Sequence, residues 1–167
     1  MAHEAQEPRE ERHAGMSETE MRENVIRLAF GGDPGRLEAF CAELTRAVPI
    51  DTAAVLRGSS VTGARWMDGA PFDAEGPGTS DLDLTLVGGE ILNLYEPHGF
   101  YIAGVHTKPL SDKDPDIAPK LLPLRQRLVA MVGRPVDIQG TKDWIMYVRD
   151  HIMGQPYLTL LGKVEAS

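Results

Sequence analysis

The clearest pattern in the chain is an alternation of apolar and polar residues over positions 81–87. The two sets are Leu82, Leu84 and Leu86 on one side and Asp81, Asp83 and Thr85 on the other. Such an alternation predicts a half-buried strand. Two carboxylates at alternate strand positions lie about 7 Å apart, so they repel each other without helping the sheet. A hard cation that takes oxygen ligands, Mg²⁺ or Mn²⁺, explains the pair better than two solvent-exposed carboxylates without a function do.

Other segments of the chain show helical or extended patterns. Helical spacing predicts four helices: one capped at Ser17, one beginning at Asp33 and Pro34, one over residues 121–132, and one capped at Thr141 and ending at Gly154. Strands are predicted at residues 52–57, 81–87, 100–105 and 135–139, and residues 156–161 form an edge strand or a docking segment. Residues 61–78 are rich in glycine and proline and predict a long loop, a kind of segment that tends to be functional or mobile.

Length and composition favour one soluble domain. A chain of 167 residues builds one core rather than two. We expect residues 17–167 to form that domain and the polar residues 1–16 to be a disordered tail. A single cysteine, no long apolar run and no signal peptide make the cytoplasm the expected compartment, without membrane contact. The net charge of −8, with no basic stripe, makes long nucleic acid an unlikely partner.

Several side chains with reactive chemistry have simple structural interpretations. Cys41 lies on the apolar face of its helix and is expected to be a small packing residue. His98 and His106 fall in turn-rich segments and are predicted to be loop residues rather than ligands. Trp66 lies in the long loop, where packing is the default and stacking on a base or an acceptor is the alternative.

Three features occur in order along the chain. An apolar strand ends in Gly58 and Ser59, the alternating strand carries Asp81 and Asp83, and a later strand carries Asp137 between two apolar residues. In this order the residues resemble the DNA polymerase β-like nucleotidyltransferase superfamily, over roughly residues 52–139. The resemblance implies an α+β fold, with a small mixed sheet, helices packed on one face and a nucleotidyltransferase (palm) core.

The resemblance also implies a reaction and a set of site residues. A nucleoside monophosphate would pass from an NTP to a hydroxyl of an unknown small-molecule or protein acceptor, with two Mg²⁺ or Mn²⁺ ions. Asp81, Asp83 and Asp137 would be the catalytic and metal-binding residues, and Asp137 would also take or orient the acceptor proton. The expected nucleotide-binding residues are Gly58, Ser59, Ser60 and Arg65, with Arg57 as a further phosphate contact.

The chain departs from the family pattern in two places. Residues 64–78 lengthen the connection between the two motifs, and only residues 141–167 follow the last aspartate strand, where many members carry a helical acceptor-binding domain. Acceptor specificity must then come from the insertion, the N-terminal helices, a second subunit or a partner protein.

Two other functions stay open. A nucleotide-binding regulatory module acting through a protein partner, as in minimal antitoxin-like members, is the main alternative. A metal-dependent glycosyltransferase is the third, because Asp-x-Asp also occurs in enzymes that use nucleotide sugars, although those folds generally need a longer chain.

Overall fold

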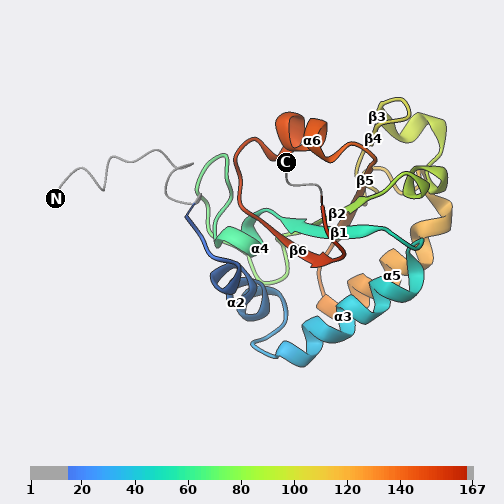
Figure 1. The fold of residues 1–167 in the computed structure, drawn as a ribbon. Helices are drawn as coiled ribbons and strands as arrows, with labels where there is room; N and C mark the ends of the chain where they lie inside the picture. Colours follow the sequence, from blue (N-terminus) through green and yellow to red (C-terminus); the bar gives the residue numbers. More distant parts are fainter. Residues whose placement is uncertain (1–14, 165–167) are drawn as a thin grey trace.

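A six-stranded open sheet forms the centre of the protein (Figure 1). Its strands are β1 (Ala53–Arg57), β2 (Leu82–Val87), β3 (Phe100–Ile102), β4 (His106–Thr107), β5 (Val136–Thr141) and β6 (Tyr157–Leu161). They lie in the order β3-β4-β5-β2-β1-β6, and β2 and β5 are parallel while the other neighbours are antiparallel. The predicted mixed sheet is confirmed, and β6 is the edge strand expected at residues 156–161.

The computed structural model describes residues 15–164. The predicted disordered tail therefore lies almost wholly outside the described residues. Within the described range, no helix has the length and apolar character needed to cross a membrane.

Helices cover both faces of the sheet, whereas helices on one face only were expected (Figure 1). The longer helices are α2 (Glu18–Ala29), α3 (Pro34–Ala47) and α5 (Leu122–Val132), and the short ones are α4 (Ser59–Thr62), α6 (Trp144–Tyr147), η2 (Glu90–Leu94), η3 (Pro97–Gly99), η4 (Pro119–Leu121) and the π-helix η5 (Val148–Ile152). The three longer helices pack on one face. The prediction fails for α6 and η5, because their aromatic and aliphatic side chains pack with Val55 on the opposite face.

The leucines of β2 form the middle of the main core. Leu82, Leu84 and Leu86 are at most 1% exposed and pack against the three longer helices. Cys41 is half-buried against this core, in agreement with its expected packing role. The alternation that predicted β2 is thus confirmed, and it leaves the polar residues of the strand on the face that α6 covers only in part.

The predicted helix starts are right at α2 and α3 and wrong at α6. Ser17 and Glu20 form the expected capping box, and Asp33 caps α3 through the amide of Gly35. At α6 the cap is Asp143 rather than Thr141. The Thr141 hydroxyl is engaged with the ring of His106 (2.6 Å between Nδ1 and Oγ1).

His106 is not a loop residue. It lies in the two-residue strand β4, pairs with Thr141 and is completely buried. A strand of two residues is too short to show a period, so the turn-forming residues around it dominated the prediction. The strand expected at residues 100–105 is shorter for a related reason, since β3 ends at Ile102 and the chain turns into β4.

Candidate active site

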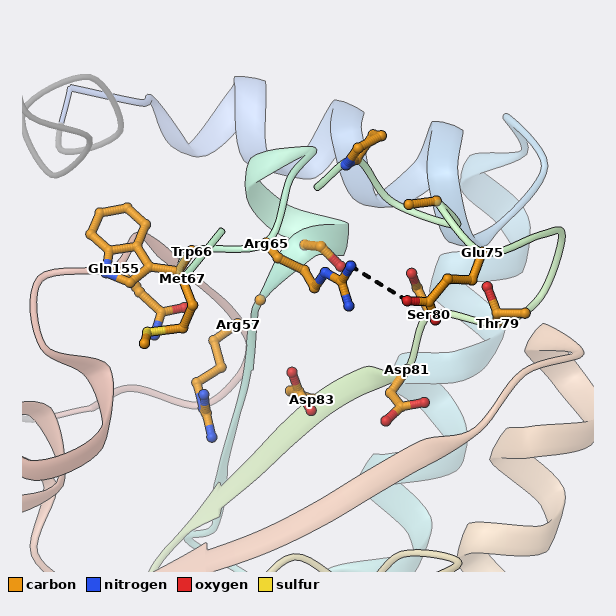
Figure 2. Close-up of a pocket in the computed structure, with 14 residues that line it drawn as sticks. Arg57, Arg65, Trp66, Met67, Glu75, Thr79, Ser80, Asp81, Asp83 and Gln155 are labelled. Carbon is orange, nitrogen blue, oxygen red and sulfur yellow. Dashed lines mark ion pairs between the residues drawn. The ribbon is translucent and has the colours of Figure 1, made fainter. Parts of the chain in front are cut away.

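The three predicted aspartates lie together at one end of the sheet. Asp83 on β2 and Asp137 on β5 are register partners on adjacent parallel strands, so their side chains leave the same face. Asp81 lies two residues before Asp83 on that side, and it is close enough to Asp137 for its charge to raise the pKa of that group. Figure 2 shows the carboxylates of Asp81 and Asp83 at the same end of β2. The sequence prediction that these groups converge is therefore supported by the geometry.

Burial and the neighbouring carboxylates raise the pKa of two of the three carboxyl groups. Burial, followed by the charges of Asp81 and Asp83, raises the pKa of Asp137 to about 7, and Arg125 opposes the change. The pKa of Asp83 is also raised, first by burial and then by Asp81, with Arg57 opposing. The site thus holds more negative charge than Arg57 and Arg125 balance. This excess favours the binding of an additional cation.

A metal ion fits the donor set but not the positions of the side chains as they stand. Carboxylate oxygens are the ligands that Mg²⁺ and Mn²⁺ prefer. Over residues 15–164, however, no group of three or more His, Cys, Asp or Glu side chains is already arranged to hold a metal. The charges of Asp81 and Asp83 raise the pKa of Asp137, and a bound cation would offset this repulsion.

Gly58 brings the end of β1 against Asp83. Its φ of +93° lies in the left-handed region, and a Cβ atom there would be 2.7 Å from Oδ2 of Asp83. The carbonyl of Gly58 accepts the amide of Val61 (3.0 Å), which begins the short helix α4. Gly58 was predicted to be a nucleotide-binding residue, because a glycine lets a phosphate approach the backbone closely. In this structure the group that lies against the glycine is the carboxylate of Asp83.

Replacing Gly58 by alanine is expected to destabilise the fold by about 2 kcal/mol and to displace the Asp83 carboxylate. Gly63→Ala is the matched control, because Gly63 also has a positive φ (+86°) but has open space around a Cβ atom. Urea unfolding of both variants separates backbone strain from the contact with Asp83. Equal losses of stability in the two variants would show that the contact has no energetic importance.

Two cavities meet at the aspartates. The first, of about 320 Å³, is lined by most of the predicted site residues: Arg57, Gly58, Ser59, Arg65, Asp81 and Asp83. The second, of about 430 Å³, is lined by Asp81 and Asp137 together with Tyr101 and Lys113. Asp81 lies on the wall of both cavities. The carboxylate cluster therefore separates two spaces that can hold two reactants.

The predicted phosphate-binding residues differ in their access to the first cavity. Ser59 lines the first cavity, whereas Ser60 is fully buried and is not among the residues that line it. Arg65 is exposed and forms ion pairs with Asp68 (3.4 Å) and Glu75 (3.6 Å), the second drawn as a dashed line in Figure 2. Ser59 and Arg65 can meet a ligand from these positions, and the geometry gives no such role to Ser60.

A polar network beneath the site was not predicted from the sequence. Arg57 donates from Nε to the hydroxyl of Tyr147 (3.1 Å) and from Nη2 to Oε1 of Gln139 (3.3 Å). The Tyr147 hydroxyl also contacts the hydroxyl of Thr85 (2.7 Å) and donates to Gln139 (3.0 Å). Thr85 and Gln139 follow Asp83 and Asp137 by two positions on their strands. Continuing the polar alternation along both strands would have indicated this network, which fixes Arg57 beside Asp83.

Removing the Tyr147 hydroxyl is expected to cost about 2 kcal/mol of stability. Phenylalanine fills the same space but removes the hydrogen bonds that the hydroxyl forms with Arg57, Thr85 and Gln139 inside the buried network. Tyr101→Phe is the control, because Tyr101 is 58% exposed. Thermal unfolding of both variants tests the expectation, and equal melting temperatures for Tyr147→Phe and the wild type would contradict it.

A second unpredicted feature is a clasp formed by Asp73, Ser80 and Arg134. Arg134 donates from Nη1 and Nη2 to the two carboxylate oxygens of Asp73 (2.6 and 3.1 Å) and lies over the ring of Phe72 (4.4 Å). Asp73 also accepts the amide of Ser80 (3.0 Å). The hydrogen bonds from Arg134 are the main reason that the pKa of Asp73 is strongly lowered. The clasp attaches the insertion, residues 64–78, to Arg134, which lies just before β5. It does so directly before Asp81.

No protein-family model, no curated protein and no solved structure matches this chain. The resemblance to the nucleotidyltransferase superfamily therefore depends on the motif residues.

Proposed function

We propose that the protein is a metal-dependent nucleotidyltransferase with a minimal polymerase β-like core. It would transfer a nucleoside monophosphate from an NTP to a hydroxyl group of a small-molecule or protein acceptor. The observation that carries the proposal is the cluster formed by Asp81, Asp83 and Asp137. Asp83 and Asp137 are register partners on parallel strands, and Asp81 lies close enough to raise the pKa of Asp137. Three acidic groups close together at one end of the sheet do not contribute to the packing of the sheet.

In this proposal the aspartates bind divalent cations and the acceptor. Mg²⁺ or Mn²⁺ held by Asp81, Asp83 and Asp137 would supply positive charge to the triphosphate and to the attacking oxygen. Asp137 lines the second cavity and orients the acceptor hydroxyl or takes its proton. The NTP occupies the first cavity, on the side of Asp83 and Gly58.

Phosphate binding is assigned to the side chains on the wall of the first cavity. Arg57 is held in place by Tyr147 and Gln139, so its guanidinium group is already positioned beside Asp83. An arginine whose orientation is fixed loses little conformational freedom on binding a phosphate. Ser59 offers a hydroxyl group from the turn that follows Gly58.

The test is to follow the label of an α-³²P-labelled NTP in the presence of Mg²⁺ and pools of small-molecule or protein acceptors. The expected result is transfer of the α-label to an acceptor, with release of pyrophosphate. Asp81→Asn should abolish transfer, and Asp116→Asn, which changes an exposed carboxylate far along the chain, should not. Equal transfer by Asp81→Asn and the wild type would overturn the proposal. Transfer of label from a γ-³²P-labelled NTP in a parallel reaction, with none from the α-labelled NTP, would instead indicate a phosphotransferase.

A further inference from the structure

The first cavity changes character from one end to the other. Figure 2 shows Asp81 and Asp83 at one side, and Trp66, Met67 and Gln155 gathered at the other, with Arg57 below and between them. We propose that the end formed by Trp66, Met67 and Gln155, here called the indole wall, is a nucleobase subsite. The base would stack on Trp66 and its edge would be hydrogen-bonded by the Gln155 amide. This inference rests on the proposed function, because it assumes that the ligand of the cavity is a nucleotide.

The backbone holds Trp66 in a defined position. Residues on either side of it form a small hairpin: the Arg65 amide donates to the carbonyl of Ala70 (2.7 Å), and Ala64 pairs with Pro71 as an antiparallel bridge. The amide of Gly69 donates to the carbonyl of Arg65 (2.8 Å) and closes the turn. An aromatic ring carried by a closed turn is a suitable stacking platform, because little order has to be created when a base binds.

Gln155 reaches the same wall from a distant part of the chain. It follows the π-helix η5, and its backbone amide donates to the carbonyl of Ile152 (3.1 Å). A glutamine side chain carries both a donor and an acceptor, which matches the paired groups on the edge of a base. Met67 is 83% exposed and adds a flexible apolar contact.

The order of groups along the cavity matches the order of groups in a nucleotide. Carboxylates suited to the cations of a triphosphate come first, then the guanidinium group of Arg57, then the indole wall. The acceptor is the less suitable occupant of the indole wall, because it must reach Asp137. Asp137 lines the second cavity, and none of the three residues of the indole wall does.

The test compares MgATP with magnesium tripolyphosphate, which has the same charged part and no base. By calorimetry, wild-type protein should bind MgATP more tightly than tripolyphosphate. Trp66→Leu should weaken MgATP binding about tenfold, since stacking of one base on an aromatic side chain has about this effect, and should leave tripolyphosphate binding unchanged. Unchanged tripolyphosphate binding also shows that the variant is folded.

Fluorescence gives an independent readout, because the chain has two tryptophans. Trp144 is 5% exposed and packs between Tyr147 and Tyr157, so it should not respond to nucleotide. MgATP should quench emission in the wild type and in Trp144→Phe, and should not do so in Trp66→Phe. Tripolyphosphate binding without any preference for MgATP would overturn the subsite alone. Absence of binding by both ligands would overturn the proposed function and the subsite with it.

Discussion

Replacing Asp137 by asparagine is expected to lower nucleotidyl transfer by about 10³-fold and to stabilise the protein in the absence of divalent cations. Activity falls because the carboxylate that would bind a cation and orient the acceptor is lost. Stability rises because the variant no longer buries a charge beside Asp81 and Asp83, whose charges help to raise the pKa of Asp137 to about 7.

The pH dependence of stability gives this prediction a defined sign. Asp137 titrates near 3.8 in an unfolded chain and at about 7 in the folded protein. Between these values the folded state binds a proton that the unfolded state has released, so stability decreases as the pH rises from about 4 to 7. Asp137→Asn should remove this part of the decrease.

Urea unfolding at pH 5 and pH 8, with EDTA and with Mg²⁺, measures the effect. In EDTA the variant should exceed the wild type in stability at pH 8 and approach it at pH 5. Mg²⁺ should stabilise the wild type and leave the variant nearly unchanged, because a ligand stabilises only the state that binds it. A variant less stable than the wild type at pH 8 in EDTA would show that the aspartates do not strain the fold.

Local patterns were sufficient to predict the residues of the carboxylate cluster. The alternation over residues 81–87 placed Asp81 and Asp83 on one face, and apolar neighbours placed Asp137 on a strand. Their meeting depends on the parallel pairing of β2 with β5, which joins segments far apart in the chain. Periodicity contains no information on which strands become neighbours. The motif order supplied that information through the family resemblance.

The parts of the fold that escaped prediction depend on partners distant in sequence. His106 is buried because Thr141 and the aromatic side chains of α6 and η5 cover it, and its own segment resembles a loop. A helix ending at Gly154 was predicted for the segment of α6 and η5, but helical spacing contains no information on the face of the sheet that a helix covers, so its packing with Val55 on the second face was missed. Arg57 was expected only to contact phosphate, although it also joins a buried network.

Arg134→Ala is expected to destabilise the protein by about 3 kcal/mol and to weaken nucleotide binding. The Arg134 side chain is 9% exposed, and its loss leaves the carboxylate of Asp73 without its main counter-charge inside the insertion. Ser80 is hydrogen-bonded to Asp73 and directly precedes Asp81. Loss of the contacts within the clasp would therefore displace the carboxylate cluster as well. Arg22→Ala is the control, because Arg22 forms an exposed ion pair with Glu18 and such pairs contribute little.

Acid titration distinguishes the clasp from general packing. Arg134 lowers the pKa of Asp73 below its ordinary value of 3.8, so the contribution of the clasp is complete above about pH 4 and is lost as the pH falls further toward the folded-state pKa. Wild-type protein should therefore lose stability below pH 4 more steeply than Arg134→Ala, while remaining the more stable of the two at pH 7. Arg134→Lys, which keeps the charge without the two-pronged contact, should fall between them. Parallel acid profiles for all three proteins would show that Asp73 and Arg134 do not hold the insertion in place.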